Sequence, residues 1–466
     1  MPRPADRSWW LEEALRHPEF AEPETPPLRA DTSADVVICG GGYTGMWTAW
    51  FLKEREPDLD VVLLEADICG GGPSGRNGGF CNGVFDELDV LIDRFGAEGR
   101  RTSEMASRSI DEIGDWCTSH AVDAWYAKAG NLGLSTNPFT DEKVAWTVAR
   151  AERLGIGEVY RPLDPDQLRS RFDSPIARSG FELTRAAMVQ PARLARGLRR
   201  LIIERGVRVF ERTPVTRFDV RGAIAETPSG TVRAGRAVLG LNAWFNAWRA
   251  LRRSIFVRAS YIAVSAPAPH LLERINWTGG EGVYDMLGSL HYLRTTPDGR
   301  IAFGGAGDRV TRRQIGPAYR YHERSIAALA ADFRRWFPTF DAVPLEVAWG
   351  GPIDMSGLTL PFFGTLAGGR THVGLGYTGN GVGPCHLGGK ILSGLALDVE
   401  DEATTLPIVG GRPTRFPPEP LLTFGARVVS RAIVRRDARH EAGRRPDPLT
   451  DALAHVPRRL GYNLGP

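Results

Sequence analysis

A short buried strand that runs into a glycine-rich turn constrains this chain more than any other feature. The apolar run over residues 35–39 is typical of a strand buried in a parallel sheet, and it ends in GGGYTG, which has the spacing G-x-G-x-x-G. A helical stretch follows over residues 46–53, and a second apolar strand over residues 61–64 ends at Glu65. Strand, turn, helix, strand and acid in this order predict a unit that binds a dinucleotide.

Each part of this unit has a physical reason. Gly40 allows the tight turn, Gly42 lets the backbone approach a pyrophosphate, and Gly45 lets helix and strand pack closely. The helix N-terminus offers N–H groups to the phosphates. Glu65 is placed to accept hydrogen bonds from a ribose diol, which disfavours NADP. The predicted cofactor contacts of this unit are Gly40, Gly42, Tyr43, Thr44, Gly45, Glu65 and Ala66.

A second glycine cluster, ICGGGPSGRNGGF at residues 68–80, directly follows the second strand. An NAD enzyme has no need of such a segment, whereas the ribityl and flavin portions of FAD extend beyond the pyrophosphate. A flexible surface loop is the alternative, but Arg76 and Asn77 among the glycines favour an anion-binding nest. The predicted contacts here are Ser74, Arg76, Asn77, Gly78 and Gly79.

These stretches resemble the D-amino-acid-oxidase-like superfamily of FAD-dependent oxidoreductases, which includes glycine and sarcosine oxidases. WWLEEAL near the N-terminus, GGGYTGMWTA and ICGGGPSGRNGG are most similar to the branch with gamma-glutamylputrescine and aminophosphonate oxidoreductases. The similarity extends to about residue 410. It implies an α/β fold (α+β overall), in which a Rossmann-like FAD-binding domain is interleaved with a substrate domain built on a mostly antiparallel sheet. It also implies adenine contact from Val215 and a strand that returns to the flavin at Asn242.

The length of 466 residues favours two domains. The resemblance implies a discontinuous FAD-binding domain of residues 1–90, 180–250 and 345–410. Residues 91–179 and 251–344 would form the substrate domain, with residues 85–180 mainly helical. Residues 411–466 would form a C-terminal basic extension whose helix, over residues 419–436, is amphipathic. A membrane-surface or partner role stays open for it, but a solvated helix packed on the main body is favoured.

A third glycine-rich stretch, LGYTGNGVGPCH at residues 375–386, lies between a predicted strand over 371–375 and a predicted helix over 383–397. It predicts a second strand–turn–helix, placed at the flavin ring and ribityl chain. Sarcosine-oxidase-like relatives carry a His after this turn and a carboxylate-binding Lys three residues later, where this chain has Asn380 and Gly383. Loss of that Lys disfavours small α-amino acids as substrates. The predicted contacts are Gly376, Gly379, Asn380, Gly381 and Val382.

Flavin amine oxidation removes a hydride equivalent from the carbon next to nitrogen, and the protein supplies orientation and electrostatics. It needs no catalytic triad and no metal, and the nine histidines show no metal-binding spacing. No residue is therefore assigned as catalytic. The substrate-pocket candidates are Phe80, Tyr261, His291, Arg294, Trp349 and Asn380, although the aromatic ones also suit a core and His291 and Arg294 suit structural bonds.

The five cysteines form no C-x-x-C pair and no flavin-linkage motif, so reduced thiols and non-covalent FAD are expected. Lys and Arg total 58 against 55 for Asp and Glu, which gives no reason to expect nucleic acid as a partner. No signal peptide or apolar run long enough to span a membrane is present, so a cytoplasmic protein is expected.

The sequence thus predicts an FAD-dependent oxidoreductase that oxidises the C–N bond of a primary or secondary small-molecule amine to an imine, which water hydrolyses. Oxygen or another acceptor would reoxidise the flavin. Two alternatives stay open. One is a dehydrogenase or oxidase of a small amino acid such as glycine or sarcosine, and the other is a non-catalytic flavin-binding protein.

Overall fold

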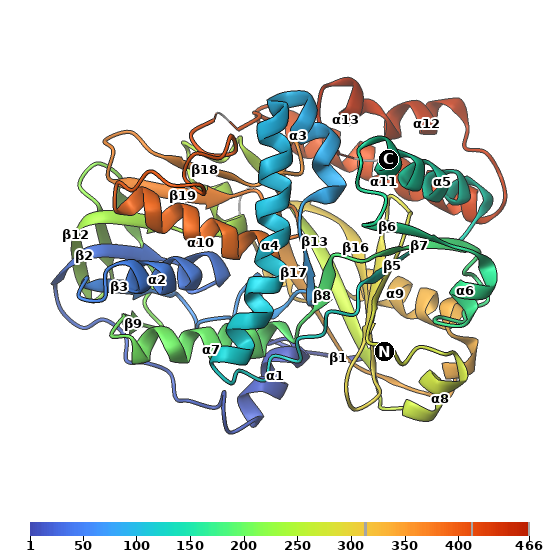
Figure 1. Cartoon of the computed structure of the whole chain (residues 1–466), viewed down its shortest axis with the longest axis horizontal. Coiled ribbons are helices and arrows are strands. Elements are labelled where there is room, and N and C mark those ends of the chain that lie inside the picture. The colour runs from blue at the N-terminus through green and yellow to red at the C-terminus, as the bar shows by residue number, and fades with distance from the viewer. Residues whose placement is uncertain (312–314, 412, 465–466) are drawn as a thin grey trace.

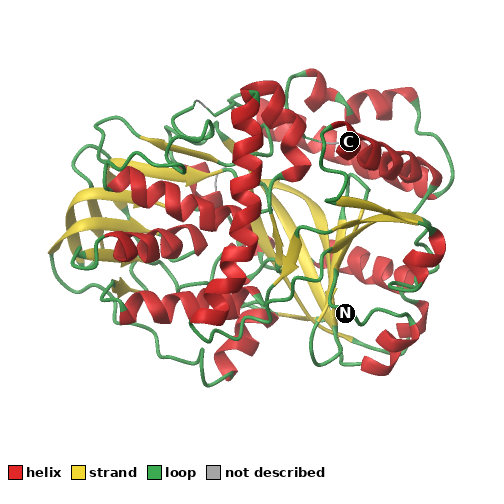
Figure 2. Ribbon diagram, in the orientation of Figure 1, coloured by secondary structure: helices red, strands yellow, loops and turns green. Residues whose placement is uncertain are grey.

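The computed structural model of the chain describes residues 1–311, 315–411 and 413–464. Within these residues the strands form sheets of eight, nine and two strands. Figures 1 and 2 show the two large sheets side by side, with the long helix α4 (Ala97–Ser119) running between them in this view. The molecule therefore has two lobes, one around each large sheet.

The eight-stranded sheet contains both strands of the predicted dinucleotide-binding unit. Its order is β10, β11, β12, β2, β3 and β9, with β19 beside β12 and β18 beside β19. The strands are β2 (Thr32–Cys39), β3 (Val61–Leu64), β9 (Arg208–Phe210), β10 (Arg217–Asp219), β11 (Ile224–Thr227), β12 (Gly230–Leu239), β18 (Phe362–Thr365) and β19 (Thr371–Leu375). The pairs between β19, β12, β2, β3 and β9 are parallel. The carboxyl ends of these strands therefore meet at one edge, which is where parallel sheets bind ligands.

Three helices cover one face of this sheet: α2 (Tyr43–Arg55), α7 (Pro191–Glu204) and α10 (Val382–Ala396). They lie together on the left of Figure 1. The largest apolar cluster of the molecule joins them to α4 and to α1 (Trp9–Arg16), with Trp10, Trp47 and Ile391 wholly buried. This packing explains why α2 is buried almost all round and shows no polar face.

The nine-stranded sheet is mostly antiparallel, in the order β1, β17, β13, β16, β15, β14, β5, β7 and β6. Only the β1–β17 and β14–β5 pairs in this order are parallel. The strands are β1 (Arg3–Pro4), β5 (Asn131–Ser135), β6 (Tyr160–Leu163), β7 (Ser179–Leu183), β13 (Ile255–Ser265), β14 (Gly282–Asp285), β15 (His291–Thr295), β16 (Ile301–Thr311) and β17 (Leu345–Ser356). Its helices are α5 (Pro138–Arg153), α6 (Pro165–Arg169), α8 (Pro269–Arg274) and α9 (Glu323–Trp336), and α3 (Leu88–Phe95) packs on α4.

The two lobes meet at a short antiparallel pair, β4 (Phe80–Asn82) with β8 (Ala186–Met188). This pair continues the second glycine cluster toward the nine-stranded sheet. The C-terminal extension forms α11 (Leu421–Glu441), α12 (Pro448–Ala454) and α13 (Val456–Arg459), so its first helix runs five residues further than predicted. All five cysteines are buried and carry free thiols.

Residues 85–180 are mainly helical, as predicted, although β5, β6 and β7 join the nine-stranded sheet. Other local expectations need correction. The strand β17, expected in the FAD-binding segment 345–410, instead pairs along its length with β13. The first residues of the chain, expected with the same domain, pair with β17 as β1. Sheet membership depends on pairing partners far away in sequence, and local pattern does not encode them.

Among the described residues, no helix combines the length and apolar character needed to cross a bilayer. The same part of the chain contains no group of three or more His, Cys, Asp and Glu side chains arranged for a metal ion.

Candidate functional site

The first glycine turn connects β2 to α2 and is built on backbone that only glycine allows. Gly40 has φ +109°, and a Cβ there would lie 2.5 Å from the carbonyl oxygen of Gly240. A Cβ on Gly45 would collide with the carbonyl oxygen of Gly40. Gly42 is the N-cap of α2 and has no side chain to cap it. The N-terminus of α2 therefore stays open to an anionic ligand.

Glu65 follows β3 and faces this turn. Its Oε2 accepts the Gly41 N–H at 2.7 Å, and its Oε1 accepts the Asp67 N–H at 2.8 Å. Burial raises the pKa of the Glu65 carboxyl above its usual value, although these two donors oppose the shift. Ala66 beside it is exposed, and the Thr213 N–H donates to the Glu65 carbonyl oxygen, which brings the segment carrying Val215 close to this acid.

The second glycine cluster lies directly over the first turn. The Tyr43 N–H donates to Ser74 Oγ at 2.9 Å, and Ser74 Oγ is also the only atom within 4 Å of a Cβ built on Gly42. Asn77 organises the loop, because its amide donates to the carbonyl oxygens of Pro73 and Ser74 and accepts the Gly79 N–H.

The side chain of Arg76 has a different environment from the anion-binding nest that the sequence predicts. It is 9% exposed and donates to three carbonyl oxygens, those of Gly71 at 2.9 Å, Asp6 at 2.5 Å and Gly350 at 3.4 Å. Burial lowers the pKa of this guanidinium to about 10. Arg76 therefore holds the loop against the nine-stranded sheet, with its hydrogen-bonding capacity directed at the protein.

The third glycine turn follows β19 and begins α10, as predicted. Gly376 and Gly379 have φ +86° and +88°, Gly381 is the N-cap of the helix, and Val382 is buried. The turn is fixed by Asp354 of β17, a residue that no motif indicated. Asp354 Oδ2 accepts the Gly376 N–H at 2.6 Å.

Asp354 also joins this turn to the end of β12. Its Oδ1 accepts the Asn242 amide at 2.9 Å, and Asn242 Oδ1 is buried without a partner among the described residues. Burial raises the pKa of Asp354 to about 7, against the N–H donors, which favour its ionised form. The only sequence signal for this residue is a single acid in the apolar, glycine-containing run AWGGPIDM.

The first and third turns are in direct contact. Thr44 Oγ1 at the start of α2 donates to the Tyr377 hydroxyl at 2.9 Å, 333 residues further along the chain. Asn380 lies at the other side of the third turn and donates to the Gly83 carbonyl oxygen, just after β4, at 2.7 Å. The structure thus brings all three glycine segments to the carboxyl edge of the parallel strands.

The substrate-pocket candidates separate into two groups. Phe80 on β4 is half-buried, packs edge to face on Tyr292 with centroids 6.0 Å apart, and lies with Asn380 at the meeting point of the lobes. Tyr292, which was not predicted, is anchored through its hydroxyl to Ser260 Oγ at 2.7 Å.

The other candidates have structural partners instead. Tyr261 is buried in the core and donates to the Ala318 carbonyl oxygen. Trp349 is fully buried and donates to the Arg76 carbonyl oxygen, and Arg294 donates to the Val189 carbonyl oxygen.

His291 lies between two carboxylates, Asp285 at 2.7 Å and Asp332 at 3.2 Å. Burial alone would lower the pKa of His291, but these two acids outweigh it and raise the pKa to about 10. His291 is therefore a buried cation in an ion-pair network, which is the structural alternative that the sequence left open.

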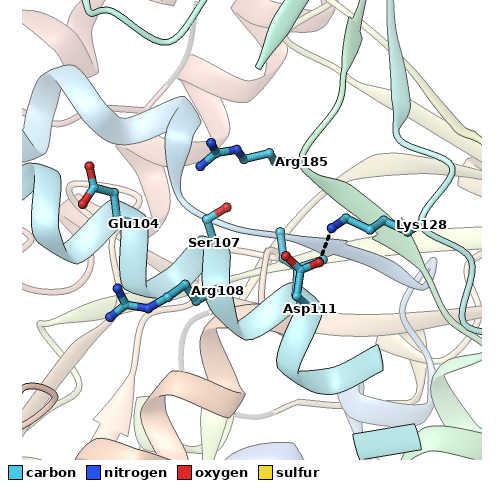
Figure 3. Close-up of a pocket in the computed structure, with 7 residues that line it drawn as sticks. Glu104, Ser107, Arg108, Asp111, Lys128 and Arg185 are labelled. Atoms are coloured by element: carbon cyan, nitrogen blue, oxygen red, sulfur yellow. Dashed lines mark ion pairs between the residues drawn. The ribbon is translucent and has the colours of Figure 1, made fainter. Parts of the chain in front are cut away.

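A separate charged cavity of about 360 Å³ opens along α4 (Figure 3). It is lined by Glu104, Ser107, Arg108, Ile110, Asp111, Lys128 and Arg185, and Lys128 pairs with Asp111. None of the predicted site residues lines it. Gly83 lies between the two regions, because a Cβ there would contact Ser107 while its carbonyl oxygen accepts the Asn380 amide.

The residues present at the three turns fit FAD. The N-cap residue of α2 is a glycine with no capping side chain of its own, Glu65 faces the first turn, and Asn242 Oδ1 is buried with no described partner near the third. A buried orphan acceptor commonly marks a position where a ligand or water completes the bonding.

Comparison with known proteins agrees with this geometry. Residues 35–395 match the family model DAO, FAD dependent oxidoreductase. The probable oxidoreductase OrdL of Rhizobium meliloti (strain 1021) is 28% identical over 410 residues, which cover 86% of this chain and 90% of OrdL. The gamma-glutamylputrescine oxidoreductase of Escherichia coli (strain K12) is 26% identical over 412 residues, covering 84% of this chain and 91% of that protein.

Among solved structures, glycine oxidase from Geobacillus kaustophilus has the same fold. Its TM-score is 0.66 at 19% sequence identity, over 82% of this chain and 99% of that one. The predicted fold class and the predicted cofactor FAD are confirmed. The chain belongs to the DAO family of FAD-dependent oxidoreductases.

Proposed function

We propose that this enzyme oxidises the C–N bond of a small primary or secondary amine to an imine, which water then hydrolyses. The relatives named above are an oxidoreductase of gamma-glutamylputrescine and an oxidase of glycine, both of which are amines. The observation that carries the proposal is the meeting of the three glycine segments through Thr44–Tyr377 and Tyr43–Ser74. Such a surface extends beyond a pyrophosphate and suits a cofactor with a ring system.

The proposed roles follow the order of the segments along the cofactor. The first turn and the second cluster would hold the pyrophosphate and ribose, with Glu65 accepting from the ribose hydroxyls and Val215 near the adenine. The third turn and Asn242 would face the ribityl chain and ring, with FAD bound non-covalently. FAD, when bound, accepts the hydride equivalent that leaves the carbon next to nitrogen. The remaining contacts are Gly40, Gly42, Tyr43, Thr44, Gly45, Ala66, Ser74, Asn77, Gly78, Gly79, Gly376, Gly379, Asn380, Gly381 and Val382.

The substrate would lie against Phe80, Tyr292 and Asn380. Loss of a hydride equivalent from the carbon next to nitrogen is assisted by the nitrogen lone pair, so the amine would react in its neutral form. A Cβ on Gly383 would collide with the Asn82 carbonyl oxygen, so a carboxylate-binding lysine cannot stand at that position without moving backbone. This supports an amine without an α-carboxylate over glycine-like or sarcosine-like amino acids.

The division into domains also remains a proposal, with boundaries moved. Residues 357–410 rather than 345–410 would complete the FAD-binding domain, because β17 pairs within the other sheet. The strand β1 would join the other domain, because it pairs with β17. We further propose that the enzyme works in the cytoplasm, where five buried free thiols persist as such.

The decisive experiment mixes purified holoenzyme anaerobically with a panel of amines, amino acids and aminophosphonates and follows flavin absorbance. We expect bleaching by at least one amine without an α-carboxylate. A protein purified without a flavin spectrum, or a flavin that no compound of the panel bleaches, would contradict the proposal. Oxygen uptake with peroxide release would then identify an oxidase, and its absence a dehydrogenase that uses another acceptor.

The first turn is tested by Gly42→Val. The added methyl groups would occupy the space between the N-terminus of α2 and Ser74, so we expect the variant to fold but to lose bound FAD. The flavin-to-protein absorbance ratio after purification is the measurement. The matched control is Gly425→Val, because a Cβ at Gly425 meets nothing within 4 Å. Stoichiometric FAD in Gly42→Val would count against this site.

A further inference from the structure

Helix α11 is fixed to the lobe of the nine-stranded sheet by one face only. Its Asp437 carboxylate accepts the Ser289 N–H at 2.7 Å, and its Glu441 pairs with Arg335 of α9 at 2.8 Å. His440 stacks on Phe139 of α5 with ring centroids 4.1 Å apart. These contacts all lie on the inner side of the helix, so the opposite side is presented outward.

The outward side carries apolar and cationic side chains at helical spacing. We call this set the outer stripe: Leu421, Phe424, Arg427, Arg431, Val434 and Arg435, all exposed. Leu421 and Phe424 are 63% and 70% exposed, far above the usual value for such side chains. Among the residues whose exposure the structure describes, ten large hydrophobic side chains are exposed, and five of them lie in the extension, which is about an eighth of the chain.

The charge of this segment is equally concentrated. Residues 411–466 contain eleven arginines and no lysine against five acidic residues, whereas the whole chain has a net charge of only +3. The extension therefore carries a net charge of +6, and the remaining residues 1–410 carry a net charge of −3. Arg427 and Arg431 form no ion pair with any residue that the structure describes, and Arg435 reaches only Asp447, at 3.5 Å. Within the described part of the chain, two of the three arginines of the outer stripe are therefore left without an ion-pair partner.

We propose that the outer stripe docks the enzyme on a membrane surface that contains anionic lipid. Arginines that alternate with leucine, phenylalanine and valine along one helix fit a headgroup layer, where guanidinium groups meet phosphates and apolar side chains reach the acyl boundary. A nucleic acid would use the arginines but leave Leu421 and Phe424 without a role. A 21-residue helix that lies flat presents about 30 Å of such surface.

The test uses holoenzyme and vesicles, so its result does not depend on the substrate. We expect cosedimentation with vesicles of phosphatidylcholine plus phosphatidylglycerol, but not with phosphatidylcholine alone, and release as salt is raised. The triple variant Arg427→Gln, Arg431→Gln, Arg435→Gln should bind about 100-fold more weakly, about fivefold per arginine. Phe424→Ser should weaken binding even at low salt.

The matched control replaces three exposed arginines outside the extension, Arg161→Gln, Arg217→Gln and Arg221→Gln, and should bind as the unmodified enzyme does. An unchanged flavin spectrum shows that each variant is folded. Failure of the unmodified enzyme to bind anionic vesicles at low salt, or equal loss in both triple variants, overturns the proposal. Concentration-dependent self-association in sedimentation that only the stripe variant loses would assign the surface to a second copy instead.

Discussion

Asp354 holds two segments of the candidate site together, although no sequence motif around it predicts this role. One carboxylate oxygen holds the third glycine turn at Gly376, and the other holds Asn242 at the end of β12. Asp354 itself belongs to β17 of the nine-stranded sheet. It therefore connects the nine-stranded sheet to the third glycine turn and to the end of β12, through hydrogen bonds of 2.6 and 2.9 Å.

The buried carboxyl of Asp354 also makes the stability of the fold depend on pH. Burial raises the pKa of this acid from 3.8 to about 7, so the protonated form favours the folded state. Its contribution to stability is full below about pH 4 and is lost as the pH rises through 7, by up to about 4 kcal/mol. We expect Asp354→Asn to flatten this part of the curve of melting temperature against pH, measured by flavin fluorescence. Asp341→Asn, an exposed control, should keep the original curve.

For His291 we predict an effect on stability without an effect on substrate binding, because its side chain is held in a buried ion-pair network. Its pKa is raised from 6.5 to about 10, so the stability it contributes is full below 6.5 and is lost as the pH rises toward 10. His291→Gln leaves the buried Asp285 without its cation and should cost about 3 to 5 kcal/mol at pH 7 in urea unfolding. KM should be unchanged. A higher KM with unchanged stability would instead support a role for His291 in substrate binding.

At the scale of elements, the strand–turn–helix units were the predictable part. The β2–α2–β3 unit and the β19–α10 unit both lie where the sequence indicated, because glycine spacing and apolar runs act locally. Their mutual contact could not be predicted, since Thr44 and Tyr377 carry no pattern that pairs them. The same holds for Arg76, whose three carbonyl acceptors come from separate segments.

The link between the two units is tested by Tyr377→Phe. Removing the hydroxyl leaves Thr44 Oγ1 without this partner in a buried position, which should cost about 1 kcal/mol. Because the bond joins the two turns, we expect FAD to bind about fivefold more weakly, measured by flavin release on dilution. Tyr321→Phe removes a half-buried hydroxyl 3.3 Å from a carbonyl oxygen and serves as control. Equal FAD affinity in the two variants would mean that the turns hold their positions independently.

At the scale of the whole molecule, the N-terminal residues and the second glycine cluster connect the lobes. β1 extends the nine-stranded sheet at β17, and the nearby Asp6 carbonyl oxygen accepts from Arg76, which also reaches Gly350 of β17. The sequence predicted a two-domain chain and placed the first residues and β17 in the FAD-binding domain, whereas both pair in the nine-stranded sheet. Strand partners depend on the completed fold, so local pattern could not show this. The glycine cluster therefore serves both as a proposed cofactor loop and as the joint between the lobes.

We predict that Arg76→Met loosens this joint. Three carbonyl oxygens lose their donor, so hydrogen exchange should quicken both in β17 and in residues 71–79, and FAD should bind more weakly. Arg76→Lys should restore little of the lost stability, because one compact ammonium group cannot reach the three carbonyl oxygens that the N–H groups of a guanidinium reach. Faster exchange in residues 71–79 alone would show that the lobes are held together elsewhere.

The burial of every cysteine has a consequence for how the enzyme withstands its own chemistry. Burial raises the pKa of all five thiols, so almost none is in the thiolate form with which peroxide reacts. If turnover on oxygen releases peroxide, thiols held in their protonated form react with it slowly. An enzyme of this kind could then produce an oxidant through many turnovers without losing activity through its cysteines.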